Sequence, residues 1–279
     1  MSFARGWRSA ACWVGWLALG WLLASCSRSP AAPPAGAASI AAVDGARLRY
    51  VPAGPFVMGT DEGWAGLRPA HEVRLEAFWI DETEVTNRRY GQCVAAGVCR
   101  PPAETTSYTR DPYFLDEAYG EYPVLHVAWQ DAQTYCQWAG RTLPSEAQWE
   151  KAARGADGRL YPWGNGAPAR DLLNNFEVSY LEDTVPVGSY PMGASPYGAL
   201  DMAGNVWEWT SDWFQPYPGG DPSASDNFGE VYKVLRGGSF VDAADATTRY
   251  PNDPGLQTHD IGFRCALSAS SHLPAPVSP

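Results

Sequence analysis

Glycine and proline constrain the fold of this chain more than any other feature. The 279 residues include 28 glycines and 24 prolines, which interrupt regular helices and strands wherever they occur inside one. The chain also carries 13 tryptophans and 14 tyrosines, which supply large side chains for a core. We therefore expect a domain built of short elements and long loops around an aromatic core.

The charge balance excludes one class of partner. Lysine and arginine number 20 against 31 aspartates and glutamates, which gives a net charge of −11. Nucleic-acid binding depends on clustered positive charge that neutralises phosphates. The sequence therefore predicts no nucleic-acid partner.

The N-terminus has the pattern of a lipoprotein signal peptide. Two arginines precede an apolar run at residues 10–24, which is too short for a typical membrane span. The run ends in LASC, which resembles the bacterial lipobox, where a diacylglycerol is attached to the cysteine. We predict a signal peptide at 1–25, lipid attachment at Cys26 and a lipid-anchored place in the bacterial cell envelope, periplasmic or surface-facing. The alternative is an ordinary cleaved signal with Cys26 incidental.

Composition divides the mature chain into three parts. Residues 26–46 are rich in alanine, proline and glycine, with little to bury, and are predicted to form a flexible tether. The tail at 269–279 is similar and is predicted to be disordered. Between them, residues 47–268 are predicted to form one domain.

Four cysteines remain after the signal and Cys26 are set aside, namely Cys93, Cys99, Cys136 and Cys265. An even number in an oxidising compartment favours two disulfides. Cys93 and Cys99 flank a short loop, which leaves Cys136 to pair with Cys265. Four buried free thiols are the alternative.

Three helices and several strands are expected. Thr86 is a suitable N-cap for a helix to about residue 96, and a second helix is predicted over about 130–139. Ser145 and Gln148 form a capping box that begins the third. The predicted strands are 48–51 and 56–58, as a hairpin-like pair, and 71–75 continuing into 78–81. Beyond residue 155 we expect turns and short strands.

Several motifs, in order along the chain, match one known family. They are VPAG at 51–54, FWIDETEVT at 78–86, GRTLP at 140–144, GALDMAGNVWEWTSDW at 198–213, RGGSF at 236–240 and GFRC at 262–265. On these motifs the chain resembles the formylglycine-generating enzyme, or sulfatase-modifying factor, family. The resemblance implies an α+β, C-type-lectin-like fold with little regular secondary structure in one domain. It also implies a bridge between Cys136 and Cys265.

The resemblance further implies structural calcium. One family site maps to the Asn175 side chain, the Phe176 carbonyl and Asp183 in a shortened acidic loop. The second site maps to the side chains of Asp201 and Glu208 and to the backbone carbonyls of Gly204 and Val206. Carboxylates and backbone carbonyls are the oxygen ligands that calcium prefers, whereas a solvated acidic turn is the alternative.

The catalytic motif of the family is absent. Its enzymes oxidise a substrate cysteine to formylglycine with a pair of cysteines that bind copper(I), a metal that selects thiolates. The stretch between Ser239 and Gly262 contains no cysteine. Formylglycine-generating activity and copper are therefore not expected.

Two polar loops, 103–122 and 240–260, are predicted to bind a small ligand or a protein. The candidate ligand-binding residues are Asp242, Asp245, Arg249, Tyr250, Asn252 and Asp253. The alternative for these residues is solvation or support of local turns. The sequence thus favours a non-catalytic binding module in a membrane-anchored lipoprotein. An oxidoreductase or maturation factor with a cysteine-independent site, and a structural envelope or motility-complex lipoprotein, remain as alternatives.

Overall fold

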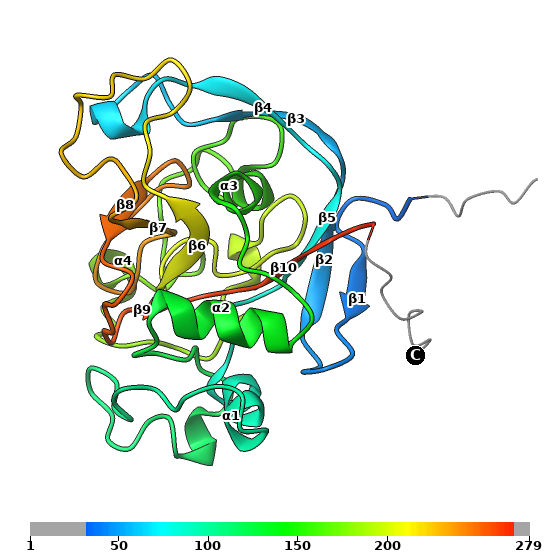
Figure 1. Cartoon of the computed structure of the whole chain (residues 1–279), viewed down its shortest axis with the longest axis vertical. Helices are drawn as coiled ribbons and strands as arrows, with labels where there is room; N and C mark the ends of the chain where they lie inside the picture. The colour runs from blue at the N-terminus through cyan, green and yellow to red at the C-terminus, as the bar shows by residue number, and fades with distance from the viewer. Residues whose placement is uncertain (1–31, 271–279) are drawn as a thin grey trace, which may run out of the picture. The chain divides into compact units, whose positions relative to one another are not determined.

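The computed structural model describes residues 32–270 (Figure 1). The predicted signal peptide, the lipid-attachment residue Cys26 and residues 271–279 of the predicted tail lie outside this range. Within residues 32–270, no helix combines the length and the apolar character needed to span a membrane.

The first sheet joins the two ends of the domain. Its strand order is β1 (Ala38–Ile40), β2 (Arg47–Val51), β5 (Phe78–Asp81) and β10 (Ala266–Ser268), with every neighbouring pair antiparallel. The tether predicted at 26–46 is therefore wrong for residues 38–46. This segment has few large apolar side chains, but β1 pairs with β2, Ala41 and Ala46 are buried, and the buried Asp44 pairs with Arg141.

The second sheet is a two-stranded ribbon of β3 (Gly54–Met58) and β4 (His71–Leu75). The predicted strands at 48–51 and 56–58 exist, but they pair in different sheets and form no hairpin. Lys151 explains the switch, since its Nζ donates to the carbonyl oxygens of Pro52 at 2.8 Å and Gly54 at 2.9 Å. These carbonyls find a partner where the chain leaves one sheet for the other.

The third sheet carries the C-terminal half. Its order is β8 (Arg249–Asn252), β7 (Lys233–Arg236), β6 (Trp207–Trp213) and β9 (Ile261–Gly262), and only the β6–β9 pair is parallel. Short strands after residue 155 are confirmed.

The helices follow the predicted caps. They are α1 (Asn87–Ala95), α2 (Trp129–Trp138), α3 (Glu146–Arg154) and the single-turn α4 (Phe176–Ser179), with 3₁₀ turns at Ala65–Leu67, Glu117–Tyr119 and Pro191–Gly193. The Thr86 and Ser145 side chains accept hydrogen bonds from the first-turn amides of α1 and α3, as expected. Figure 1 shows α3 between the β3–β4 ribbon and the third sheet, and α3 contacts both.

The core is aromatic and is linked by two disulfides. Tyr135 lies 5.6 Å from Tyr90 and 5.5 Å from Phe263 between ring centroids, and all three side chains are buried. The predicted bridges Cys93–Cys99 and Cys136–Cys265 are both present. The longer bridge ties α2 to the segment before β10.

Buried arginine–carboxylate pairs hold distant segments together. Arg264 donates to both carboxylate oxygens of Glu208 at 2.7 Å, and neither residue is exposed. Three further buried arginines pair in the same way. These pairs are Arg141 with Asp44 and Asp81, Arg236 with Glu146 and Glu150, and Arg249 with Glu146. Each charge depends on its partner, because a buried charge without one is strongly unfavourable.

Candidate functional site

The two loops predicted to bind a ligand lie side by side. The amide of Ala103 donates to the carbonyl oxygen of His126, and the amide of His126 donates to that of Thr258, both at 3.0 Å. The segment before α2 therefore lies between the two loops and links their backbones. Their adjacency is a product of tertiary folding, since the loops are more than 100 residues apart.

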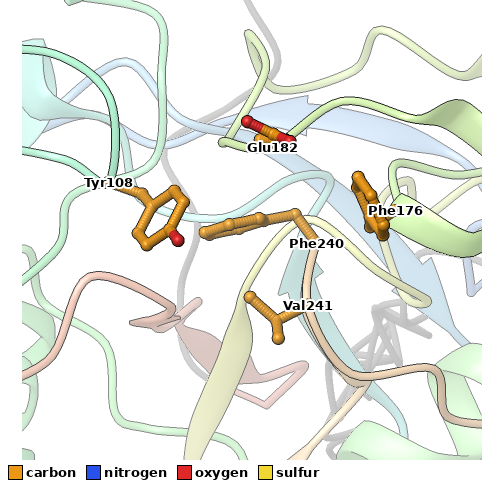
Figure 2. A pocket seen from close by; sticks show the side chains of 5 residues that line it. All are labelled: Tyr108, Phe176, Glu182, Phe240 and Val241. Carbon is orange, nitrogen blue, oxygen red and sulfur yellow. The ribbon is translucent and has the colours of Figure 1, made fainter.

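Where the loops meet, side chains form a small cavity that we call the aromatic pocket. It is lined by Tyr108, Phe176, Glu182, Phe240 and Val241 and has a volume of about 210 Å³. Figure 2 shows Phe240 between Tyr108 and Phe176, with Glu182 on one side and Val241 on the other. Drug-sized ligands occupy cavities of about 300–1,000 Å³, so this pocket suits a smaller group.

The walls of the aromatic pocket differ in exposure. Phe240 is 2% exposed and forms the floor, whereas Tyr108 is 60% exposed and Phe176 is 44% exposed. The Tyr108 ring lies 6.2 Å from the Phe240 ring and 5.3 Å from the imidazole of His259. A rigid floor under exposed aromatic faces is suited to recognition.

The RGGSF motif places the floor. The backbone leaves β7 through Gly238 at φ +73°, and a Cβ there would lie 2.6 Å from the carbonyl oxygen of Asp242, so glycine is required. The amide of Phe240 donates to the carbonyl of Asn205 at 2.9 Å, and its carbonyl accepts from the amide of Phe176 at 2.7 Å. Phe240 and Phe176 are therefore fixed relative to each other.

The charge at the aromatic pocket comes from Glu182. Within residues 32–270, the Glu182 carboxylate takes part in no salt bridge, and no arginine or lysine lines the pocket. The neighbouring Arg110 is engaged elsewhere, since it pairs with Asp183 at 3.0 Å and lies over the Tyr122 ring at 4.9 Å. The pocket is therefore apolar with a negative rim.

His126, between the two loops, combines a rare backbone conformation with a buried imidazole. It is a non-glycine residue at φ +56°, it is 5% exposed, and neither ring nitrogen has a hydrogen-bond partner within the described chain. Burial lowers the pKa of His126, Glu104 opposes this shift, and His259 reinforces it. The imidazole is therefore neutral at neutral pH.

The six predicted ligand residues do not converge on one site. Asp242 and Tyr250 both lie near Trp207, whose indole donates to Asp242 at 3.2 Å and whose ring centroid lies 5.8 Å from that of Tyr250. Arg249 is buried, donates to Glu146 at 2.8 Å and borders a separate polar cavity of about 540 Å³.

The other three residues of this group support turns. Asp245 accepts hydrogen bonds from the amides and hydroxyls of Thr247 and Thr248. Asp253 accepts from the amide of Gly255, and Asn252 accepts from the amide of Asp253. These three side chains therefore support local turns, which is the alternative role expected for them.

The first predicted calcium set does not fit a cation. Asp183 already accepts from Ser107, from Thr109 and from the Thr184 amide, and it pairs with Arg110. The Asn175 oxygen caps α4 by accepting from the Glu177 amide at 3.1 Å. Protein donors thus occupy the oxygens that calcium would need.

The second set fits calcium only in part. Both oxygens of Glu208 accept from Arg264, and Oε2 also accepts from the Trp149 indole at 2.9 Å. Asp201 is buried beside Glu84, whose Oε2 has no hydrogen-bond partner in the described chain. Carboxylate oxygens are ligands that calcium prefers, so Asp201 and Glu84, rather than Glu208, are the candidate carboxylates here.

The described residues contain no cluster of three or more histidines, cysteines or acidic residues able to hold a metal ion. The four cysteines at positions 93, 99, 136 and 265 are all consumed in disulfides. Residues 32–270 therefore offer no thiolate pair for copper(I).

Comparison with known proteins agrees with this fold. The model of the sulfatase-modifying factor enzyme 1-like domain matches residues 38–269. The chain belongs to this family. It is 34% identical to the inactive C-alpha-formylglycine-generating enzyme 2 of Mus musculus over 273 residues, which cover 79% of this chain and 85% of that protein. It is 35% identical to the formylglycine-generating enzyme of Streptomyces coelicolor over 281 residues, 78% and 88% of the two chains.

Solved structures of similar fold extend the likeness. PvdO from Pseudomonas aeruginosa superimposes with a TM-score of 0.68 at 25% identity and covers 85% of this chain and all of that one. A protein named formylglycine-generating enzyme and one named as its inactive counterpart are thus about equally similar to this chain. Overall similarity therefore does not decide whether this chain is active, and the question depends on the residues of the site.

The two loops predicted from the sequence supply three of the five pocket residues, Tyr108, Phe240 and Val241. Phe240 ends the RGGSF motif, and Tyr108 belongs to the tyrosine-rich loop, so both positions carried a signal. Glu182 lies outside both loops and carried no signal of ligand binding, because its role in the pocket depends on neighbours distant in sequence. Phe176 was expected to supply a carbonyl, whereas its ring lines the pocket.

Proposed function

We propose that this domain is a non-catalytic binding module of the formylglycine-generating enzyme family, with the aromatic pocket as its ligand site. The observation that carries the proposal is the change of chemistry between Ser239 and Gly262. This stretch contains no cysteine, and Phe240 and Val241 there line an apolar pocket. The stretch therefore offers aromatic surface and no thiolate.

The binding role is tested by ligand-observed NMR on the full chain, with a panel of neutral, anionic and cationic fragments. We expect at least one charge class to bind to the wild-type chain and to lose binding in Tyr108→Ala. Asn227→Ala, in an exposed turn that does not line the pocket, is the matched control. Absence of binding by every class, or binding that Tyr108→Ala leaves intact, would overturn the proposal.

The non-catalytic role is tested separately. The purified chain is loaded with copper(I) and incubated with a cysteine-containing peptide, and aldehyde formation is followed by mass spectrometry. We expect no aldehyde above a blank without protein. Turnover would instead favour the alternative of a cysteine-independent oxidoreductase on this fold.

The proposal includes an anchor and structural calcium. A lipid on Cys26 would hold the domain at the bacterial cell envelope, and its support is the lipobox-like sequence before that residue. Cys26→Ser is expected to release the chain from the membrane fraction, and unchanged fractionation would exclude the anchor. Calcium would stabilise the turn at Asp201, where the neighbouring Glu84 offers a free oxygen.

A further inference from the structure

We propose that the aromatic pocket binds a small organic cation, with an alkylated ammonium group as its best match. The inference rests on the proposed function and adds the chemical class of the ligand. Three aromatic rings line the pocket, together with one carboxylate and one aliphatic side chain. Aromatic faces attract cations through the ring quadrupole, and alkylated ammonium groups also gain from apolar contact.

Glu182 supplies the charge that such a ligand would meet. It is exposed at the rim and takes part in no salt bridge within residues 32–270, so its charge is available. A cation is attracted to this carboxylate, whereas an anion is repelled by it.

Within residues 32–270, no arginine or lysine lines the pocket. Arg110, the nearest arginine in sequence to Tyr108, donates to the Thr184 carbonyl at 3.0 Å and pairs with Asp183. The His259 ring centroid lies 5.3 Å from that of Tyr108 and 6.1 Å from that of Phe240, but His259 is not a lining residue. The pocket therefore has aromatic walls and one carboxylate, and its lining holds no arginine or lysine.

The size and rigidity of the pocket support a small headgroup. It has a volume of about 210 Å³ above Phe240, which is almost fully buried and whose carbonyl accepts a hydrogen bond from the Phe176 amide. Because the floor is fixed before the ligand arrives, little ordering is needed on binding. A compact trialkylammonium group fits these conditions better than a long flexible chain.

The experiment is a calorimetric titration of the full chain with choline and with 3,3-dimethylbutan-1-ol. The second compound has nearly the same shape, but a neutral carbon replaces the quaternary nitrogen. We expect choline to bind at least about tenfold more tightly, because the cation–π attraction requires the charge. Equal binding of the two compounds would overturn the proposal.

Two variants localise the effect. Glu182→Gln is expected to weaken choline binding about fivefold, as for a solvent-accessible ion pair. Glu177→Gln makes the same chemical change on the adjacent helix, outside the pocket lining, and is expected to leave the affinity within about twofold. Equal losses in both variants would indicate a diffuse field instead of this site and would overturn the assignment to the pocket.

A third probe, glycerophosphocholine, distinguishes a free cation from a lipid headgroup. The acidic rim disfavours its phosphate, so we expect choline to bind more tightly. Tighter binding of glycerophosphocholine that depends on Tyr108 would still support the cation site but would make a lipid the source. Tyr108-dependent binding of neutral or anionic fragments alone would overturn this inference and leave the binding module intact.

Discussion

Arg264 and Glu208 face each other across the core, with the guanidinium Nε and Nη2 donating to the two carboxylate oxygens at 2.7 Å. Glu208 lies in β6 of the third sheet, and Arg264 precedes β10 of the first sheet, so the pair joins two sheets. Both residues are fully buried. The carboxylate that the family resemblance assigned to calcium therefore holds an arginine.

Removing one partner of this pair should destabilise the domain strongly. We expect Glu208→Gln to lower the free energy of unfolding by about 3–5 kcal/mol, because Arg264 would remain buried without a counter-charge. Urea unfolding followed by fluorescence measures the change. Glu121→Gln, which breaks the exposed pair with Arg88, is the control and should cost less than about 1 kcal/mol. A similar cost for both variants would contradict the argument.

The two disulfides should contribute unequally. Their cysteines are separated by 129 and 6 residues, and the entropy lost by the unfolded chain grows with loop length. The double variant Cys136→Ala/Cys265→Ala is expected to lose about 5 kcal/mol and Cys93→Ala/Cys99→Ala about 2 kcal/mol. Melting temperatures of both variants check the order, and a larger loss from the short loop would refute this account.

Stability should fall in mild acid because of His126. Burial lowers its pKa below the ordinary value of 6.5, so the unfolded chain binds the proton more tightly than the folded one. The contribution is present above pH 6.5 and is lost as the pH falls toward the lowered pKa. Groups facing the imidazole are Glu104, His259 and the backbone of Thr106 and Gln257.

The measurement is the urea midpoint at about pH 7.5 and about pH 5.5 for the wild type and His126→Asn. Asparagine tolerates the positive φ at this position, so the variant keeps the backbone and removes the titrating group. We expect a smaller midpoint shift in the variant than in the wild type. The control His71→Asn should retain the full shift, and a full shift in His126→Asn would assign it to other groups.

Lys151 should matter for the strand switch between the first two sheets. Lys151→Met leaves the Pro52 and Gly54 carbonyls without their donor, and we expect a loss of about 2 kcal/mol. Arg74→Met, on the exposed face of β4, is the control and should change stability by less than about 0.5 kcal/mol. Unfolding midpoints that coincide for the two variants would exclude this role.

Calcium binding remains a prediction with a direct test. If Asp201 and Glu84 hold the ion, dialysis with calcium followed by elemental analysis should give about one ion per chain. Asp201→Ala should abolish it, whereas Asp183→Asn should leave it unchanged, because the surrounding donors already satisfy Asp183. Retention in Asp201→Ala would place any calcium elsewhere.

Local sequence rules determined the starts of α1 and α3 and the short disulfide. The caps at Thr86 and Ser145 act within one turn of the chain, so their effect is readable without the fold. The Cys93–Cys99 bridge closes a short loop for the same reason. The family motifs then indicated the fold class. Glycines in these motifs, such as Gly238, stand where the backbone of the fold leaves no room for a side chain.

Tertiary structure decided which distant groups meet. The switch between the first two sheets involves Lys151, which contacts Pro52 in space but is distant from it in sequence. The end of the predicted tether is held by the ion pair of Asp44 with Arg141. The aromatic pocket combines three segments around Tyr108, Phe176 and Phe240. Sequence fixes the chemistry of each side chain, but only the packed chain brings these side chains within contact distance, because their association depends on long-range burial and not on local propensity.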